Sequence, residues 1–330
     1  MKRYGNLWNK IISKNNILNA HRNARKGKTH YKEVKMVDKH EEHYISRIHY
    51  ILKNSRYKTS EYEVFDYNDG NKIRTISKLP YYPDRIVHWA IMLQIENVFL
   101  KTFINDTYAS IPKKGIHYGV KRIKKALKDE RNTKYCLKLD IKKFFPSINH
   151  DILKSLLKRK FKDKKLLNLL YEIIDSSDGV PIGNYLSQYF ANFYLNYFDH
   201  HMKSLGVKYY FRYMDDIVIL HKDKDYLHNL LKYEITPYLK KELKLTIKEN
   251  WQIFPTKIRG IDFIGYRFFG NYTLLRKSTY KKMRYKISKC RNKEHLKRSK
   301  SSYKGWLMWA NCYNLKLKYI KEWFYATKWY

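Results

Sequence analysis

The sequence predicts an α+β fold in which an antiparallel sheet carries helices on one side. Three observations lead to this expectation. Short apolar runs that alternate like strands recur along the chain, and longer segments between them place apolar residues at helical spacing. The 330 residues, 44% of them hydrophobic, are enough to form a large core shared by two or three subdomains.

The first third of the chain reads as helices followed by a hairpin. Residues 1–60 are basic with apolar residues at helical spacings, and Tyr62–Tyr67 alternates like a strand. Asp69–Gly70 is a strong turn signal, after which Lys72–Ile76 returns as a second strand. A helix is then expected over Arg85–Phe99.

The middle of the chain alternates strands and helices. Tyr135–Leu139 predicts a short strand that ends at Asp140, and Asp151 is expected to cap a Leu-rich helix that continues to about residue 175. Residues 178–184 read as a loop, and a helix is expected from there to His201.

The last part of the chain begins with a tight hairpin. Tyr209–Tyr213 and Ile217–Leu220 are apolar strands on either side of Met214-Asp215-Asp216. Helix is expected over about 225–243, strands over 245–254 and 261–269, and basic helices over the last sixty residues.

The charge balance points to a polyanionic partner. Lys and Arg number 69 against 30 Asp and Glu, a formal net charge of +39. Such an excess strains a compact fold unless an anion lies nearby, and nucleic acid is the natural candidate. The other interpretation is a Lys-rich composition that merely favours solubility. Three distant cysteines, no secretory signal and no apolar run of membrane-spanning length predict a soluble protein of a reducing cytosol, with no membrane partner.

Three aspartates have the arrangement that metal-dependent phosphoryl transfer requires. Asp140 ends one predicted strand, and Asp215 and Asp216 occupy the turn of a predicted hairpin. If these strands are neighbours, the carboxylates meet at one sheet edge and repel one another unless cations bind. Two Mg²⁺ ions, or Mn²⁺ in their place, are the expected cofactors, because hard cations take oxygen ligands. Taken alone, an Asp-Asp pair is more often only a polar turn.

The strings around these aspartates carry a family resemblance. FRYMDDIVIL (211–220) resembles the YxDD box of reverse transcriptases, and LKLDIKKFFPSI (137–148) their first carboxylate motif. GVPIGNYLSQYFANFYL (179–195) and IDFIGYRF (261–268) resemble the motif between the two and the primer-grip motif. The resemblance implies a right-hand polymerase fold and an RNA-directed DNA polymerase, a nucleotidyltransferase that uses template RNA, RNA/DNA hybrid and dNTPs. It also implies fingers over 1–110, palm over 111–149, a fingers insertion over 150–180, palm over 181–270 and a helical thumb over 271–330.

One departure from the usual pattern suggests a subgroup. Where most reverse transcriptases have Gln-Gly-x-x-x-Ser-Pro, this chain has Ile182-Gly183-x-x-x-Ser187-Gln188. That form, with RGIDFIGYRFF (259–269) and LLRKS (274–278), resembles the enzymes of diversity-generating retroelements. The resemblance implies copying of a template-repeat RNA into cDNA, hypermutation at template adenines and a small basic accessory variability protein. The alternative is a group II intron-like or antiviral-defence reverse transcriptase without targeted mutagenesis.

The resemblance also assigns substrate contacts. Phe145 lies where the family places an aromatic ring under the incoming sugar, which would exclude a 2′-hydroxyl; one of Phe144 and Phe145 should be core. Lys72 and Arg74 lie on the hairpin that closes over the triphosphate. The remaining substrate-binding and metal-binding residues implied are Ile182, Gly183, Ser187, Gln188 and Tyr213 for substrate, and Asp140, Ile141, Asp215 and Asp216 for metal. Ile182, unlike Gln, cannot hydrogen-bond near the nucleotide, which could loosen base selection.

The basic C-terminal segment is the expected nucleic-acid contact. Residues 281–300 carry ten Lys or Arg against one acidic residue, Glu294. The residues expected on the duplex backbone are Lys281, Arg284, Lys289 and Arg291. Tyr303, Trp306 and Trp309 could stack on bases, but packed core is the favoured interpretation. The family's lysine general acid has no clear counterpart: Trp251 occupies its aligned position and Lys248 lies nearby.

Two other function classes remain open at this point. A catalytically dead nucleic-acid-binding module could keep the fold, although the intact Asp140, Asp215 and Asp216 speak against it. An RNA polymerase with the same palm would not need Phe145 or the Tyr213-Met214-Asp215-Asp216 string.

Overall fold

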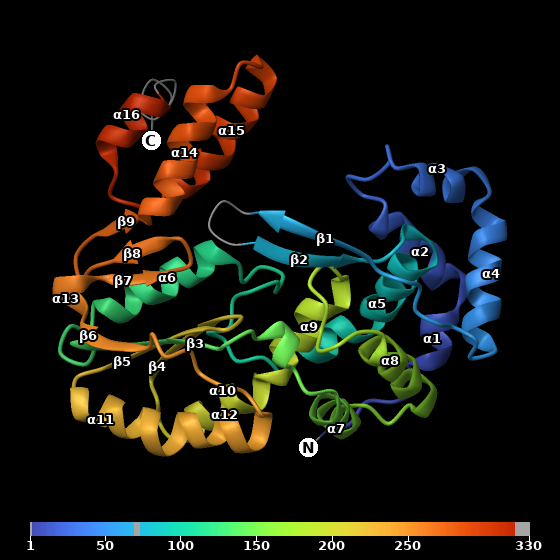
Figure 1. The fold of residues 1–330 in the computed structure, drawn as a ribbon, viewed down its shortest axis with the longest axis horizontal. Coiled ribbons are helices and arrows are strands. Elements are labelled where there is room, and N and C mark those ends of the chain that lie inside the picture. Colours follow the sequence, from blue (N-terminus) through green and yellow to red (C-terminus); the bar gives the residue numbers. More distant parts are fainter. Residues whose placement is uncertain (1, 69–72, 321–330) are drawn as a thin grey trace. The chain divides into compact units, whose positions relative to one another are not determined.

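The computed structural model describes residues 2–68 and 73–320, and the chain divides into two compact units (Figure 1). The first unit comprises residues 1–105, 141–201 and 236–246, and the second comprises 106–140, 202–235 and 247–330. The chain therefore passes between the units at residues 140 and 141, directly after the first predicted catalytic aspartate.

The first unit is built around one apolar helix. Its helix α5 (Ile86–Leu100) is apolar on every side and packs against α1, α2 and α9. Asn16 donates a side-chain hydrogen bond of 2.9 Å to the carbonyl of Ala90 and so fixes α2 against α5. The other elements are α1 (Trp8–Ile12), α2 (Lys14–Ala24), α3 (Lys32–Lys39), α4 (Glu41–Lys53), α7 (His150–Lys160), α8 (Lys164–Asp175), α9 (Tyr185–Tyr194), most of α10 (Asn196–Ser204) and α12 (Thr236–Leu243).

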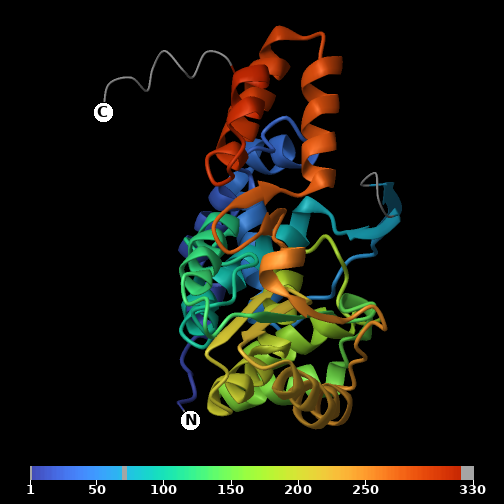
Figure 2. The ribbon, with the colours of Figure 1, turned by 90° about the vertical axis from the view of Figure 1, so that its left-hand side faces the viewer.

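A two-stranded hairpin also belongs to the first unit. Strands β1 (Glu63–Asn68) and β2 (Ile73–Lys78) pair antiparallel with Phe65 opposite Ile76. Every residue of β1 is exposed, so the hairpin projects from the helices, as Figure 2 shows. The predicted strands are confirmed, while the turn signal Asp69–Gly70 lies outside the described residues.

A four-stranded antiparallel sheet forms the frame of the second unit. Its order is β4 (Tyr209–Tyr213), β5 (Asp216–His221), β3 (Tyr135–Asp140) and β6 (Gln252–Pro255). The two central strands are mostly buried: Cys136, Leu137 and Leu139 on β3 and residues 217–220 on β5 are shielded from solvent. The second unit also contains α6 (Ile116–Leu127), α11 (Lys224–Asn229) and α13 (Thr256–Arg259).

A second, smaller sheet and three helices complete this unit. Strands β7 (Ile261–Phe263), β8 (Tyr266–Phe268) and β9 (Thr273–Leu275) pair in sequence order. Helices α14 (Lys277–Lys289), α15 (Lys293–Leu307) and α16 (Tyr313–Tyr319) follow them. One core joins the sheets, α6 and the base of these helices, with Val218, Phe263 and Met283 among its buried members.

Three sequence predictions need correction. Residues 261–269 form two strands, not one, because Ile264 (φ 44°) and Gly265 (φ 84°) both take left-handed conformations and reverse the chain. The Leu-rich helix expected up to about residue 175 is interrupted between Lys160 and Lys164, and Asn149, not Asp151, caps its start by accepting from the Ile152 N–H. The strand expected over 245–254 begins only at Gln252.

Candidate active site

Asp140 and Asp216 face each other across two central strands. Asp140 is the last residue of β3 and Asp216 the first of β5, and the antiparallel register makes them direct partners. Cross-strand partners on one face have Cβ atoms about 4.5–5.5 Å apart. Two carboxylates therefore meet at one end of the sheet, as predicted from the strand-end position of Asp140.

Asp215 completes the cluster from the turn between β4 and β5. Tyr213 pairs with Asp216, which leaves Met214 and Asp215 as a two-residue turn. Met214 takes φ 53°, a left-handed conformation that such tight hairpin turns require. The fully buried Arg212 supports the turn by donating a 2.9 Å hydrogen bond from Nη1 to the Met214 carbonyl.

Burial makes the charges in this cluster unfavourable. Desolvation raises the pKa of Asp215 above its ordinary value, and a hydrogen bond with Asp140 together with that residue's charge raises it further. Desolvation also raises the pKa of Asp216, against the opposing effect of Lys138. The cluster therefore favours any arrangement that brings cations to it.

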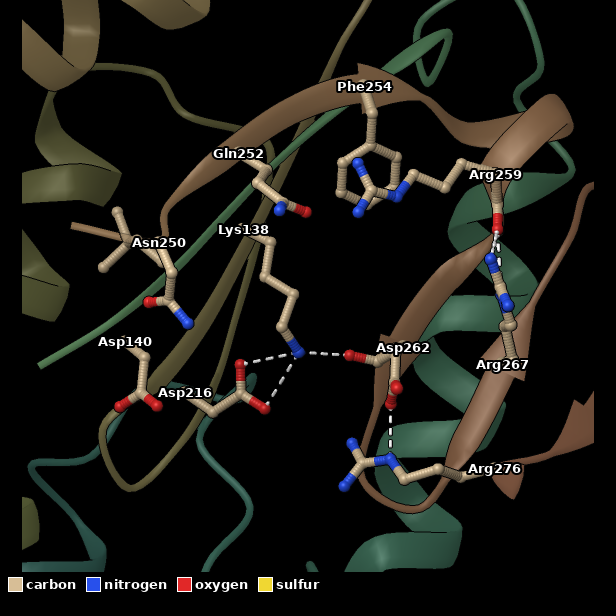
Figure 3. A pocket seen from close by; sticks show the side chains of 12 residues that line it. Lys138, Asp140, Asp216, Asn250, Gln252, Phe254, Arg259, Asp262, Arg267 and Arg276 are labelled. Carbon is tan, nitrogen blue, oxygen red and sulfur yellow. Dashed lines mark hydrogen bonds and ion pairs between the residues drawn. The ribbon is translucent and has the colours of Figure 1, made fainter. Parts of the chain in front are cut away.

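Two lysines supply part of that positive charge. Lys248 Nζ lies 2.6 Å from Asp140 Oδ2, and Lys138 Nζ lies 3.2 Å from Asp216 Oδ1. Figure 3 shows Lys138 extended between Asp216 and Asp262. A cavity of about 520 Å³ opens beside these groups, and it is lined by Lys138, Asp140, Asp216, Asn250, Gln252, Arg259, Asp262, Arg267 and Arg276, among others.

The donor set fits a hard divalent cation. All three side chains offer carboxylate oxygens, and Asp140 Oδ1 is buried without a hydrogen-bond partner. Within residues 2–68 and 73–320, no three His, Cys, Asp or Glu side chains are already gathered as a metal site. Lys248 and Lys138 each offset part of the charge of one carboxylate, and a bound divalent ion would offset the rest. The prediction that Asp140, Ile141, Asp215 and Asp216 bind metal stays a prediction.

The family model for reverse transcriptase (RNA-dependent DNA polymerase) matches residues 66–268, more than half of the chain and all three aspartates. The chain belongs to the reverse transcriptase family. The predicted class, an RNA-directed DNA polymerase with the polymerase fold, is thereby confirmed. Reverse transcriptases use divalent metal ions, in agreement with the donor set.

Individual relatives of this reverse transcriptase are distant. Protein YkfC of Escherichia coli strain K12 is 23% identical over 260 residues, 65% of this chain and 67% of YkfC. The group II intron-encoded protein LtrA of Lactococcus lactis is 26% identical over 152 residues, 43% of this chain but only 25% of LtrA. A telomerase structure from Candida albicans, in complex with a fragment of telomeric RNA, has a TM-score of 0.50 at 12% identity; the match covers 72% of this chain and 51% of the telomerase.

The predicted nucleotide contacts of the reverse transcriptase lie mostly in the first unit. Phe144 is buried and Phe145 half-buried, so the expectation that one of the pair is core is confirmed. Ile141, which follows Asp140 directly, is fully buried. Arg74 lies exposed on β2 opposite Tyr67, whereas Lys72 lies outside the described residues.

The Ile182–Gly183 segment lies against β2. The Ile182 carbonyl accepts a 2.9 Å hydrogen bond from the Ser77 N–H. Gly183 takes φ 128°, and a Cβ there would lie 2.8 Å from the Ser77 carbonyl oxygen, so only glycine fits. Ser187 is buried in the first turns of α9 and Gln188 is half-buried. Glycine is therefore needed here for contact with β2, whatever its contact with substrate.

The predicted duplex contacts are exposed on one helix and its end. Lys281, Arg284 and Lys289 lie on α14 and Arg291 follows it, all with exposed side chains. Tyr303, Trp306 and Trp309 instead pack against the core of the second unit, which confirms the core interpretation. No helix in the described part of the chain has the length and apolar character needed to cross a membrane.

The sequence alone does not predict that two lysines contact the carboxylate cluster. Lys248 was noted without a role, and the structure places its Nζ at Asp140, whereas Trp251 is 37% exposed. Lys138 was not singled out at all. Strand alternation could have found it, because residues two apart on β3 point to the same face as Asp140.

Proposed function

We propose that this chain copies an RNA template into DNA, with Asp140, Asp215 and Asp216 holding two divalent ions at the growing 3′ end. The observation that carries the proposal is the cross-strand pair Asp140–Asp216 beside the Asp215 turn. Bound ions would activate the attacking hydroxyl and neutralise the leaving phosphate. The chain itself would hold the three carboxylates in place on paired strands. Ile141, directly after Asp140, is proposed to contribute to metal binding.

Substrate selection follows from the first unit in this proposal. The half-buried Phe145 ring would exclude ribonucleotides, and Arg74, with Lys72, would neutralise the triphosphate. The Ile182–Gln188 segment of the first unit and, separately, Tyr213 of the second unit are proposed substrate contacts.

The duplex would lie along the exposed cations of α14. The net charge of +39 supports a polyanionic partner, and the Candida albicans telomerase of the same fold was solved with RNA. The proposal divides the chain into fingers (1–110 with the insertion 150–180), palm (111–149 and 181–270) and thumb (271–330).

The test is Mg²⁺-dependent incorporation of labelled dNTP on a primed RNA template. Asp215→Ala should abolish incorporation, whereas Asp225→Asn on the exposed start of α11 should leave it within about twofold. A protein that binds the primed RNA but incorporates nothing, with or without Mn²⁺, would be a binding module. Preference for NTP over dNTP would instead make it an RNA polymerase.

A finer proposal concerns the error spectrum. We infer from the Ile182-Gly183 form that the enzyme copies a template-repeat RNA and misincorporates opposite adenine, aided by a small basic accessory protein. The Ile182 main chain is hydrogen-bonded to β2 and its side chain is half-buried; we propose that this apolar side chain influences base selection. Ile182→Gln should lower misincorporation opposite adenine in single-nucleotide insertion assays, and Ile258→Gln, at an 81% exposed position, should not.

The alternative is a group II intron-like enzyme without targeted errors. It is favoured by the matches to LtrA and YkfC. Equal error rates opposite all four template bases, unchanged in Ile182→Gln, would decide for this alternative.

A further inference from the structure

The ammonium nitrogen of Lys138, on β3, contacts both β5 and the β7–β8 hairpin. Its Nζ lies 3.2 Å from both carboxylate oxygens of Asp216 and donates to the main-chain carbonyl of Asp262 (Figure 3). The Asp262 carboxylate in turn accepts from Arg276 Nε, directly after β9. A continuous polar connection therefore runs from the metal-binding end of β5 through β3 to the β7–β8 hairpin.

Strand geometry explains how Lys138 reaches both sides. It stands two residues before Asp140, so both side chains leave the same face of β3. Its cross-strand partners are Val218 on β5 and Gln252 on β6, and its Nζ lies 5.9 Å from the centroid of the Phe263 ring. The side chain is only 26% exposed, which leaves the ammonium little freedom to turn to water.

The two lysines of the cluster differ in how firmly they are held. Among the described residues, Asp140 is the only hydrogen-bond and ion-pair partner of Lys248 Nζ. Lys138 has an acceptor on each side, one of them a main-chain carbonyl that cannot rotate out of reach. Lys138 is therefore a fixed counter-charge, and Lys248 an exchangeable one.

We propose that Lys138 is a positioning residue that fixes Asp216 relative to the main chain of the β7–β8 hairpin and acts as the permanent counter-ion of the carboxylate cluster. The inference rests on the proposed function and deepens it. The β7–β8 hairpin carries the string that resembles the primer grip. The distance between this hairpin and the metal-binding carboxylates would therefore stay constant through each cycle of nucleotide addition.

The proposal makes opposite predictions for metal binding and for turnover. Removing the ammonium leaves Asp216 without its neighbouring cation, so a divalent ion is attracted more strongly. The same change frees the hairpin from the carboxylates, so the primer end loses its alignment. A residue with a merely structural role would lower both together through partial unfolding.

The experiment uses Lys138→Met, which keeps the length of the side chain but removes the charge. Binding of Mn²⁺ alone, followed by the EPR signal of the free ion, should tighten about three- to tenfold. At saturating metal, kcat for dNTP incorporation should fall roughly 10- to 100-fold with KM for dNTP within about twofold. Lys257→Met, which breaks the exposed 2.6 Å pair with Glu130 in the same unit, is the matched control and should change neither value. Unchanged or weakened Mn²⁺ binding in Lys138→Met overturns the proposal.

A second variant keeps the test decisive if Lys138→Met does not fold. Lys138→Arg retains the charge, but a planar guanidinium cannot reproduce the contacts of an ammonium held between two acceptors. Mn²⁺ affinity should stay within about twofold, while kcat falls by about tenfold. Wild-type turnover in this variant excludes the positioning role.

Failure of this inference is distinguishable from failure of the proposed function. If the wild-type chain incorporates no nucleotide, the proposed function fails, yet Mn²⁺ binding still reports on Lys138. If the wild-type chain is active and Lys138→Met behaves like Lys257→Met, only the inference fails.

Discussion

Two regions of this reverse transcriptase bury polar groups in opposite ways. At the end of β3 and β5, charged carboxylates are kept in contact with the ammonium groups of Lys138 and Lys248. Around the start of α5, Asp84 is fully buried with the Tyr57 hydroxyl as its neutral partner, and His88 Nε2 has no partner among the described residues. The first region pairs carboxylates with ammonium groups, whereas burial in the second favours the neutral form of His88.

The difference shows what each region is stabilised for. A buried ion requires a counter-charge. Where the neighbouring side chains supply too little of it, binding of a metal ion becomes favourable. Burial disfavours the charged form of a group that can be neutral. Desolvation therefore lowers the pKa of His88 to about 4.

Asp140→Asn should break the catalytic region alone. We expect kcat to fall by roughly a thousandfold or more, because the variant removes one proposed metal ligand and its charge. The free energy of unfolding in EDTA should change by less than about 1 kcal/mol, because the pair with Lys248 is partly exposed. Nucleotide incorporation and chemical denaturation measure the two effects; a large loss of stability would show that the cluster is structural instead.

His88 should make the first unit sensitive to acid. Its folded pKa lies below the unfolded value of about 6.5, so the unfolded state binds the extra proton between these pH values. Stability is then full above about pH 6.5 and falls, by roughly 2–3 kcal/mol in total, as the pH drops towards 4. His88→Leu should flatten this part of the curve in thermal unfolding measured against pH, and the exposed His43→Leu should not.

Tyr57→Phe should destabilise the region around the start of α5 without affecting the carboxylate cluster at the ends of β3 and β5. The variant removes the 2.6 Å hydrogen bond to Asp84 Oδ1 and leaves only the Ser60 N–H on that oxygen. A cost of about 1–3 kcal/mol in urea denaturation is expected for a buried acceptor that loses a donor. Tyr50→Phe, at a residue that is 55% exposed, is the control. Equal losses of stability in Tyr57→Phe and Tyr50→Phe would contradict the idea that burial makes the Tyr57–Asp84 hydrogen bond important.

Val64→Ala on β1 should have the smallest effect. Val64 is 60% exposed, so its methyl groups contribute little buried area and the free energy of unfolding should change by less than about 0.5 kcal/mol. The corresponding change on β5, Ile219→Ala, removes a fully buried side chain and should cost about 2–5 kcal/mol. Similar denaturation midpoints for the two variants would show that the hairpin is buried in solution.

Much of the site was predictable because its signals are local. A strand that ends in Asp140 and an Asp-Asp turn between two apolar runs are visible in short windows, and the structure contains both. The division of 261–269 into two strands was missed because alternation continues across the turn, and only the left-handed conformation of Ile264 and Gly265 reveals it. The break after Lys160 was missed for a similar reason, since Leu residues on both sides keep helical spacing.

Strand β3, the β4–β5 hairpin, the carboxylates at their ends and the family of the chain could be predicted from the sequence, because each follows from periodicity or from contiguous strings. Tertiary structure alone decided that Asp140 faces Asp216, that Lys138 reaches the β7–β8 hairpin and that Gly183 lies against Ser77. Those pairings depend on register and on contacts between distant segments, and the free energy that selects them comes from burial of the whole core, which no short stretch of sequence contains.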